Sequence, residues 1–393
     1  MKEEESLIDK SGMGNSIKSD TPLVSIPATY VSEEARYVSV CWKCKGTGLK
    51  PVKKKNIKTI PLKCTVCNGM SKLLPNHTKK HKPLRPFRTN SNWVVPGPKS
   101  KYEMNDPKMA PAEDEMLSSL SGHWCIYQLE NGHRMTTDDV CVAAIAIQHL
   151  RNTITELNHL DIGTGLSSVL SMIHWAFYDK IQKSIGIEAQ AIHVSLAQKT
   201  LEFNGVRDRC QIIHQDLRDI SDANMFPFKF DLITGTPPYF PPPNGTLPTV
   251  PGRGMCAFEF RGGIELYCRI ASLFLKRNEQ SRFIVANTSI EIQRTEAAGT
   301  AVGFKLIERW DVHGKIDKTS LFSVFIFKWD STEQTNPHPL ERQSIESCPV
   351  RHINVRGLDG QFTDEYSELM SLVGKPPPTY ETGTIPQKRN RDS

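Results

Sequence analysis

Short strand-like runs alternate with helical patterns along most of the chain after about residue 120, and this alternation constrains the fold more than any other feature. The runs His159–Ile162, Ser184–Glu188 and Cys210–His214 have the length and apolar content of strands. Between them, Ser167–Tyr178 and Gln190–Asn204 have helical patterns. Strands that alternate with helices predict βαβ units and a largely parallel sheet.

The same alternation continues toward the C-terminus. Phe230–Thr234 and Ser281–Ala286 are predicted to be strands, and Gly263–Leu275 is predicted to be a helix between them. Phe304–Trp310 and Leu321–Trp329 are predicted to be two strands joined by a loop rich in Gly, Lys and Asp. We expect these two strands to form an antiparallel edge of the sheet.

Four of the ten cysteines form two close pairs with the spacing C-x2-C, nineteen residues, C-x2-C: Cys41, Cys44, Cys64 and Cys67. Two such knuckles can bring four thiolates to one tetrahedral Zn²⁺. A site closed by four thiolates is structural, because it leaves no position for water. The alternative is a redox dithiol, which usually has one C-x-x-C beside a βαβ unit. The first knuckle resembles the cysteine-rich repeats of DnaJ-type co-chaperones, although that family has four such repeats and this chain has two.

The other six cysteines are scattered, and we expect them to be ordinary small apolar residues: Cys125, Cys141, Cys210, Cys256, Cys268 and Cys348. The N-terminus, Met-Lys-Glu-Glu-Glu-Ser, is acidic and has no apolar signal-peptide run. The chain also has no run of about 18 apolar residues, the length needed to cross a membrane. We therefore expect a cytoplasmic or nuclear protein without disulfides.

The charge of the chain is concentrated in one segment. Residues 41–101 contain 16 Lys and Arg and no Asp or Glu, which leaves −10 for the rest of a chain whose formal net charge is +6. Such a block can neutralise phosphates and release counterions, so it favours contact with nucleic acid. The alternatives are a solvated basic linker and a localisation signal.

A glycine-containing turn follows the first of the predicted parallel strands. In Asp161-Ile-Gly163-Thr-Gly165, glycine lets the backbone approach a ligand closely at a helix N-terminus. Ser168 stands where the third glycine of a dinucleotide fingerprint would be. Glu188 ends the next strand, 27 residues after Asp161, where a carboxylate can accept hydrogen bonds from ribose hydroxyls.

Two further motifs belong to the same predicted crevice. Asp216 follows the third strand, where its carboxylate can accept a hydrogen bond from an adenine amine. The fourth strand leads into Thr236-Pro237-Pro238-Tyr239, whose prolines cannot continue a central strand. The prolines stiffen this loop, and Tyr239 offers a flat face on which a planar group can stack. A rigid carbonyl beside an aromatic ring suits an amine attached to a flat ring.

These motifs together resemble the class I S-adenosylmethionine-dependent methyltransferases, in the amino-methylating branch with an Asn-Pro-Pro-Tyr motif. More narrowly, residues 120–370 resemble the bacterial tRNA adenine N6-methyltransferases with the small methyltransferase domain. Gly132-His-Arg-Met-Thr-Thr-Asp138 resembles that family's segment before the glycine turn. The stretch 353–366 resembles its C-terminal strand and turn. The resemblance implies an α/β, Rossmann-like methyltransferase sheet with helices on both faces, which here follows the small N-terminal zinc-binding module.

The resemblance also implies roles for individual residues. Asp161, Gly163 and Gly165 would border the methionine end of S-adenosylmethionine. Glu188 would hold the ribose and Asp216 the adenine. The resemblance further suggests a cofactor contact for Asp138. The catalytic residues would be Thr236, Pro237, Pro238 and Tyr239, which would grip the target amine while Tyr239 stacks on the base.

Position 236 departs from the family pattern, because the family has Asn there and this chain has Thr. A hydroxyl is a shorter and differently aimed acceptor than a carboxamide oxygen, although the Pro237 carbonyl could still accept from the amine. The predicted function is methylation of an adenine N6 amine in tRNA or another RNA, held through the basic segment 41–101. Two alternatives stay open. One is methylation of a protein or small molecule, and the other is a catalytically silent methyltransferase fold that binds RNA or a partner.

The sequence predicts five segments. They are a disordered N-terminus (1–36), the four-cysteine zinc module (37–72), a basic proline-rich linker (73–119), the methyltransferase domain (120–372) and a disordered tail (373–393).

Overall fold

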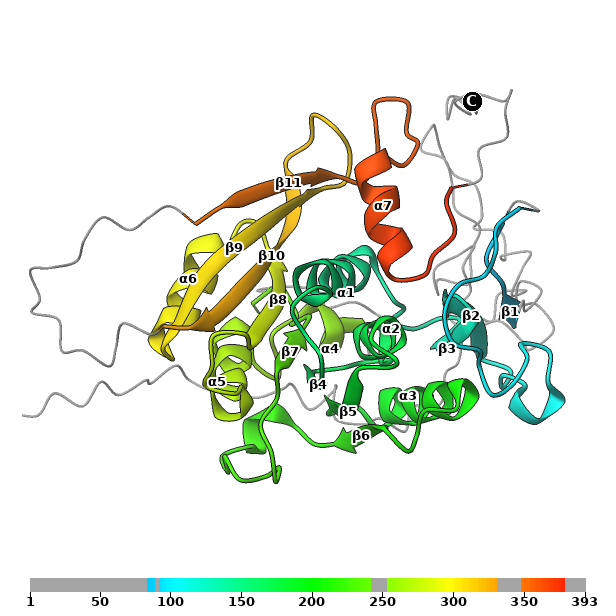
Figure 1. The fold of residues 1–393 in the computed structure, drawn as a ribbon, viewed down its shortest axis with the longest axis horizontal. Helices are drawn as coiled ribbons and strands as arrows, with labels where there is room; N and C mark the ends of the chain where they lie inside the picture. The colour runs from blue at the N-terminus through cyan, green and yellow to red at the C-terminus, as the bar shows by residue number, and fades with distance from the viewer. Residues whose placement is uncertain (1–82, 90–91, 242–252, 331–347, 379–393) are drawn as a thin grey trace, which may run out of the picture. The chain divides into compact units, whose positions relative to one another are not determined.

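The computed structural model describes residues 83–89, 92–241, 253–330 and 348–378 (Figure 1). The four paired cysteines and the segments predicted as 1–36 and 37–72 lie outside these residues. All described residues belong to one compact unit that spans Ser39–Ser393. Its helices and strands are β1 (Leu84–Arg85), β2 (Glu115–Ser121), β3 (Trp124–Leu129), α1 (Thr137–Leu150), β4 (Leu157–Ile162), α2 (Ser168–Ala176), β5 (Ile181–Glu188), α3 (Ala191–Asn204), β6 (Cys210–His214), β7 (Leu232–Gly235), α4 (Arg253–Ala257), α5 (Ile264–Phe274), β8 (Arg282–Thr288), α6 (Ile292–Ala301), β9 (Phe304–His313), β10 (Ser320–Trp329), β11 (Val350–Asn354) and α7 (Asp364–Leu372).

The main sheet contains eight of the described strands, in the order β11-β9-β10-β8-β7-β4-β5-β6. Strands β4 to β8 pair in parallel with one another, which confirms the predicted parallel core. Strand β10 is antiparallel to both β8 and β9, as expected for the hairpin. The hairpin is not the edge, however, because β11 pairs in parallel with β9 outside it.

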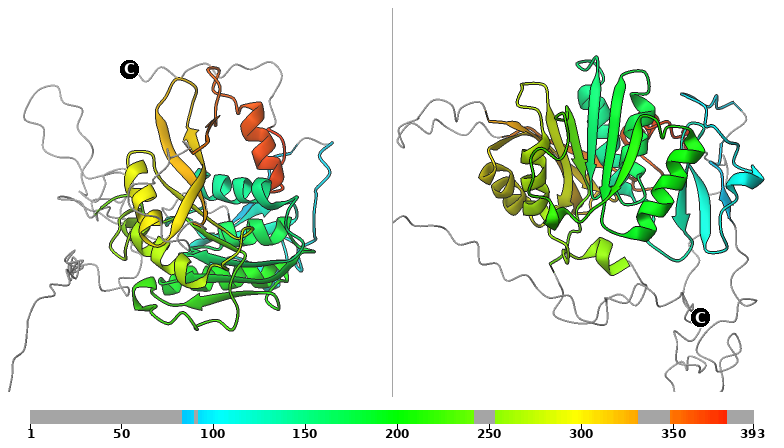
Figure 2. Two further views of the ribbon diagram at one scale, coloured as in Figure 1. Left: turned by 60° about the vertical axis from the view of Figure 1, so that its left-hand side comes forward. Right: turned by 90° about the horizontal axis from the view of Figure 1, so that it is seen from below.

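Helices cover both faces of this sheet, so the predicted α/β fold class is confirmed (Figure 2). Strand β10 shows how its residues divide between the faces, because side chains alternate along a strand. Phe322, Val324 and Ile326 belong to the apolar cluster that includes α1, α2 and α7. Phe325 and Phe327 belong to the cluster that includes α5 and α6. The sheet is therefore buried on both sides, as a parallel core requires.

A second, three-stranded sheet packs beside the main one. Strand β1 pairs in parallel with β2, and β2 is antiparallel to β3. Every residue of β3 is buried, and its backbone is fixed to α3 by two side chains. The N–H of Cys125 donates to Asn204 Oδ1 at 3.0 Å, and that of Tyr127 donates to Thr200 Oγ1 at 3.0 Å.

The segment expected to be a linker thus contributes β1 and most of β2 to a packed sheet. The sequence of β2 is Glu-Met-Leu-Ser-Ser-Leu-Ser, and its three serines made a buried strand difficult to predict. All but one of its residues are buried. The other domain boundaries stay predictions. No helix among the described residues is both long and apolar enough to span a bilayer.

Candidate functional site

A cavity of about 410 Å³ lies at the carboxyl ends of the parallel strands, where ligands bind in open α/β sheets. Its walls come from the loops that follow β4, β5, β6 and β7, and from the start of α1. Nine of the residues predicted as site residues line it: Asp138, Gly163, Gly165, Glu188, Asp216, Thr236, Pro237, Pro238 and Tyr239. The sequence motifs therefore converge on one cavity.

The two glycines of the turn after β4 serve different purposes. Both have left-handed backbones, with φ of 65° at Gly163 and 56° at Gly165. A Cβ at Gly163 would lie 2.1 Å from the hydroxyl oxygen of Tyr267 on α5. A Cβ at Gly165 would meet no atom within 4 Å. Gly163 is thus required by the packing of the protein itself, whereas Gly165 keeps open a space beside the cavity.

Asp161 lies at the end of β4 and is buried, but it is not among the residues that line the cavity. Its two carboxylate oxygens accept hydrogen bonds of 2.6 Å from the hydroxyls of Thr164 and Thr234. Burial raises the pKa of Asp161 to about 6, and these hydroxyls oppose the rise. Asp161 therefore joins the glycine turn to β7 through these two hydrogen bonds. It was expected to border the methionine end of the cofactor, but it does not line the cavity.

The hydroxyl of Thr234 also has a second partner, His159 Nε2, at 2.8 Å. Because the Thr234 hydroxyl donates to Asp161, His159 must be the donor and carry its proton on Nε2. Burial lowers the pKa of His159 to about 3, so its ring is neutral. The chain His159–Thr234–Asp161 is a fixed, fully buried network beneath the cavity.

Glu188, at the end of β5, connects two of the loops. Its Oε2 accepts from the N–H of Gly165 at 2.9 Å, and its Oε1 accepts from the N–H of Gln190 at 2.7 Å. His193 Nδ1 lies 3.8 Å from Oε1. Burial by itself raises the pKa of Glu188, but His193 and the two backbone donors outweigh it and hold that pKa below its ordinary value. Glu188 is therefore an ionised acceptor in the cavity wall.

Asp216 lies where the sequence predicted it, after β6, but it is already engaged by two guanidinium groups. Its oxygens accept from Arg218 Nε at 3.0 Å and from Arg218 Nη2 at 2.9 Å, and Arg261 Nε lies 3.5 Å away. Burial opposes ionisation, but these cations hold the pKa of Asp216 below its ordinary value. An amine that bound this carboxylate would have to share it with two arginines.

The loop Thr236–Tyr239 after β7 is held by two consecutive carboxylates at the start of α1. The hydroxyl of Tyr239 donates to Asp138 Oδ2 at 2.6 Å, and the hydroxyl of Thr236 donates to Asp139 Oδ1 at 3.4 Å. Burial and the charge of Asp138 raise the pKa of the Tyr239 phenol well above its ordinary value, so the phenol remains a donor.

Asp139 was not among the residues singled out from the sequence, although it lines the cavity and is buried. Its Oδ2 accepts from the N–H of Thr136 at 3.0 Å. Burial raises the pKa of Asp139 most, and the negative charge of Asp138 raises it further. The pattern Thr136-x-x-Asp139 before an apolar run is a capping box, which marks the start of a helix. This pattern is the sequence signal that could have identified Asp139 as a carboxylate held in place.

Tyr267 on α5 is a second residue that sequence reasoning missed. Its ring also blocks a Cβ at Gly235, which would lie 2.7 Å from its Cδ1. The same side chain thus packs against both the turn after β4 and the end of β7. No local motif marks this residue, because its role depends on packing between distant segments.

The described residues contain no group of three or more His, Cys, Asp or Glu side chains placed to hold a metal ion. Cys41, Cys44, Cys64 and Cys67 lie outside those residues, so the zinc site remains a prediction.

No protein-family model matches the chain, and no curated protein matches it. Solved structures with similar folds include a predicted O-methyltransferase from Agrobacterium tumefaciens, with 13% identity, a TM-score of 0.41, and coverage of 62% of this chain and all of that one. Two others are a putative tRNA (m1A22) methyltransferase from Streptococcus pneumoniae (11% identity, TM-score 0.33, 50% and 71% coverage) and a tRNA m1G37 methyltransferase from M. jannaschii (8%, 0.38, 56% and 56%). All three TM-scores are below 0.5.

Proposed function

We propose that this protein is an S-adenosylmethionine-dependent methyltransferase that methylates an exocyclic amine, with adenine N6 of tRNA or another RNA as the target. The observation that carries the proposal is the convergence of the glycine turn, Glu188 and the Thr236–Tyr239 loop on one cavity. These are the parts needed for a nucleoside cofactor and for an amine on a flat ring.

The cofactor end of the cavity has a suitable form. The space above Gly165 is one that a Cβ would fill, so ligand atoms can approach the backbone there. Ribose hydroxyls would donate to the ionised Glu188, and the adenine amine would donate to Asp216. When bound, S-adenosylmethionine supplies a methyl group already activated by its sulfonium.

The acceptor end is formed by the loop after β7. The Thr236 hydroxyl and the Pro237 carbonyl would accept hydrogen bonds from the amine, which frees its lone pair from the ring. Tyr239 would stack on the base. The protein would contribute mainly proximity and orientation, which can lower a barrier by several kcal/mol.

Aromatic side chains beside this loop support a nucleic-acid acceptor. Phe240 is 48% exposed and lines the cavity. The ring of Phe258 lies 6.1 Å from that of Phe240, and the ring of Phe260 lies 5.8 Å from that of Phe258. A splayed-out RNA base leaves neighbours that need a stacking surface, and the exposed ring of Phe240 would supply one, whereas Phe258 is half-buried and Phe260 is buried. The basic segment 41–101 and its proposed zinc module, with Zn²⁺ on Cys41, Cys44, Cys64 and Cys67, would hold the phosphates.

Thr236 is the feature that favours a second candidate, methylation of a protein or small molecule, because it replaces the expected Asn. The test is a transfer assay with labelled S-adenosylmethionine and total RNA from a deletion strain, read by nucleoside mass spectrometry. Labelled N6-methyladenosine that is lost in Glu188→Gln supports the proposal. Intact cofactor binding without any labelled nucleoside overturns the RNA assignment. Absence of cofactor binding overturns the enzyme assignment and leaves a binding protein.

A further inference from the structure

The hydroxyl of Thr236 lies between the acceptor end of the cavity and a buried carboxylate. Thr236 and Asp139 both line the cavity, and their side chains meet at 3.4 Å. The other oxygen of Asp139, Oδ2, accepts from the N–H of Thr136 at 3.0 Å, and this bond orients Oδ1 toward Thr236. This contact is long for a hydrogen bond between two oxygens, but catalytic hydrogen bonds often tighten only when substrate is bound, so its length is compatible with a catalytic role.

We propose that Thr236 and Asp139 form a proton relay that removes the proton released when the acceptor amine is methylated. This inference rests on the proposed function. The amine lone pair forms the new N–C bond, and the methyl–sulfur bond breaks with its electrons left on sulfur. The amine N–H passes its proton to Thr236 Oγ, and the Thr236 hydroxyl proton passes to Asp139 Oδ1. Asp139 becomes a neutral acid and later returns its proton to water.

A hydroxyl suits this role and a carboxamide does not. Threonine can accept one proton while it donates another, whereas an Asn side chain can accept a hydrogen bond but cannot pass a proton on. The threonine at position 236 thus keeps the acceptor function and adds a path to Asp139. Asp138 cannot replace Asp139, because its carboxylate already accepts from Tyr239 and from the Thr136 hydroxyl.

The surroundings of Asp139 suit a proton acceptor that works near neutral pH. Burial and the negative charges of Asp138 and Asp161 raise its pKa, while hydrogen bonds from Thr136 and Ser168 oppose the rise. The other titratable groups that interact with it are Lys375 after α7, the phenol of Tyr239, the buried thiol of Cys141 and the half-buried thiol of Cys256. A base is most effective when its pKa lies near the working pH.

The test is single-turnover methyl transfer at several pH values, with total RNA from the deletion strain as acceptor. We expect Asp139→Asn and Thr236→Val each to slow transfer about 10²- to 10⁴-fold, the usual contribution of a proton-transfer group. Thr236→Ser keeps the hydroxyl and should retain most of the rate. In the unmodified protein the rate should rise with pH up to the pKa of Asp139, and this rise should disappear in Asp139→Asn.

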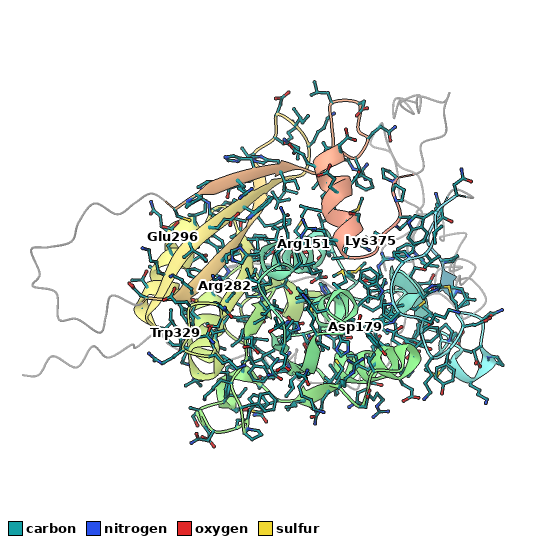
Figure 3. The ribbon with its side chains drawn as sticks, viewed as in Figure 1. Arg151, Asp179, Arg282, Glu296, Trp329 and Lys375 are labelled. Carbon is teal, nitrogen blue, oxygen red and sulfur yellow. The ribbon has the colours of Figure 1, made fainter. Side chains whose placement is uncertain are left out.

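Three readouts separate a relay from a merely structural role. Cofactor affinity should stay near that of the unmodified protein, the melting temperature should not fall below it, and the double variant should be no slower than either single variant. Asp179→Asn is the control, because Asp179 is exposed in the turn between α2 and β5 (Figure 3). Asp139→Asn that keeps both the rate and its pH dependence, in a protein whose unmodified form is active, overturns the relay. If the unmodified protein methylates no amine, the proposed function itself has failed.

Discussion

The hydroxyl of Tyr239 donates a 2.6 Å hydrogen bond to Asp138, and this bond joins the loop after β7 to the first turn of α1. Asp138 was expected to touch the cofactor. It does line the cavity, but its carboxylate fixes the ring that is proposed to stack on the acceptor.

Asp138→Asn and Tyr239→Phe should therefore have similar effects. Each weakens the link while leaving the ring in place, so kcat/KM for the acceptor should fall about tenfold with unchanged cofactor affinity. Tyr239→Ala also removes the ring and should lower kcat/KM for the acceptor considerably more. Steady-state kinetics with Asp179→Asn as control would measure this. A loss of cofactor affinity in Asp138→Asn would instead support a cofactor contact for Asp138.

The two glycines of the first turn should separate stability from binding. Alanine at either position adopts a left-handed backbone, which costs roughly 1–2 kcal/mol. Gly163→Ala must also displace Tyr267, whose hydroxyl would lie 2.1 Å from the new Cβ, so it should lower the melting temperature much further. Gly165→Ala should fold with a modest loss but bind S-adenosylmethionine weakly. Thermal melts with and without the cofactor check both, and equal melting temperatures for the two variants would contradict the packing argument.

The buried carboxyl of Asp161 should make stability depend on pH. Burial raises its pKa to about 6 in the folded protein, above an unfolded value of about 3.9. The folded state therefore binds more protons between these values, and the free energy of unfolding should fall as pH rises through them, by on the order of 2–3 kcal/mol. Asp139 acts in the same direction. Urea unfolding between pH 4 and 8 should show a shallower fall in Asp161→Asn, and an identical slope would refute the assignment.

Much of this arrangement could be predicted from the sequence. Strands β4 to β8 and helices α2, α3 and α5 were predicted because their patterns are local and their ends coincide with glycine, acidic or proline residues. Helix α1 was not, because Cys-Val-Ala-Ala-Ile-Ala-Ile is apolar on nearly every side and lacks a helical stripe. The helix is buried within the apolar cluster that includes α2 and α7, so its pattern reflects tertiary packing.

The same distinction holds for the site. Residues at strand ends were predictable because parallel strands bring their carboxyl ends to one edge. The pairing of Asp139 with Thr236 joins residues 97 positions apart, and only the approach of α1 to the loop after β7 creates it. Asp161 was predicted as a site residue, but its burial beneath the turn depends on the hydroxyls of Thr164 and Thr234, which no motif marks.

Trp175, at the end of α2, is enclosed by glycines from three distant segments. A Cβ at Gly97 or Gly374 would lie 2.5 Å from its indole ring, and one at Gly122 would lie 3.0 Å from its Nε1. The N–H of Gly122 also donates to the carbonyl of Gly374 at 2.8 Å. The indole therefore anchors the segment before β2 and the segment after α7 to the main domain.

Gly374→Ala should consequently destabilise the protein more than Gly360→Ala does. Both positions have left-handed backbones, with φ of 68° and 83°, but a Cβ at Gly360 would meet nothing within 4 Å. The difference should be about 1–3 kcal/mol, the usual effect of overpacking. Chemical unfolding of the two variants measures it directly. Equal losses would mean that the segment after α7 moves away without penalty.

The proposed zinc module gives the last prediction, which concerns RNA affinity. If Cys41, Cys44, Cys64 and Cys67 hold Zn²⁺ and the basic segment around them holds phosphates, Cys41→Ser with Cys64→Ser should release about one equivalent of zinc and weaken RNA binding. The slope of log affinity against log salt should also become shallower, because fewer counterions are displaced.

Cys348→Ser is the matched control, since Cys348 is a half-buried thiol outside the pairs. Metal analysis and binding at several salt concentrations test both parts. Unchanged affinity and salt slope in a zinc-free, folded protein would separate the module from RNA binding, and a zinc-free unmodified protein would exclude the metal site itself.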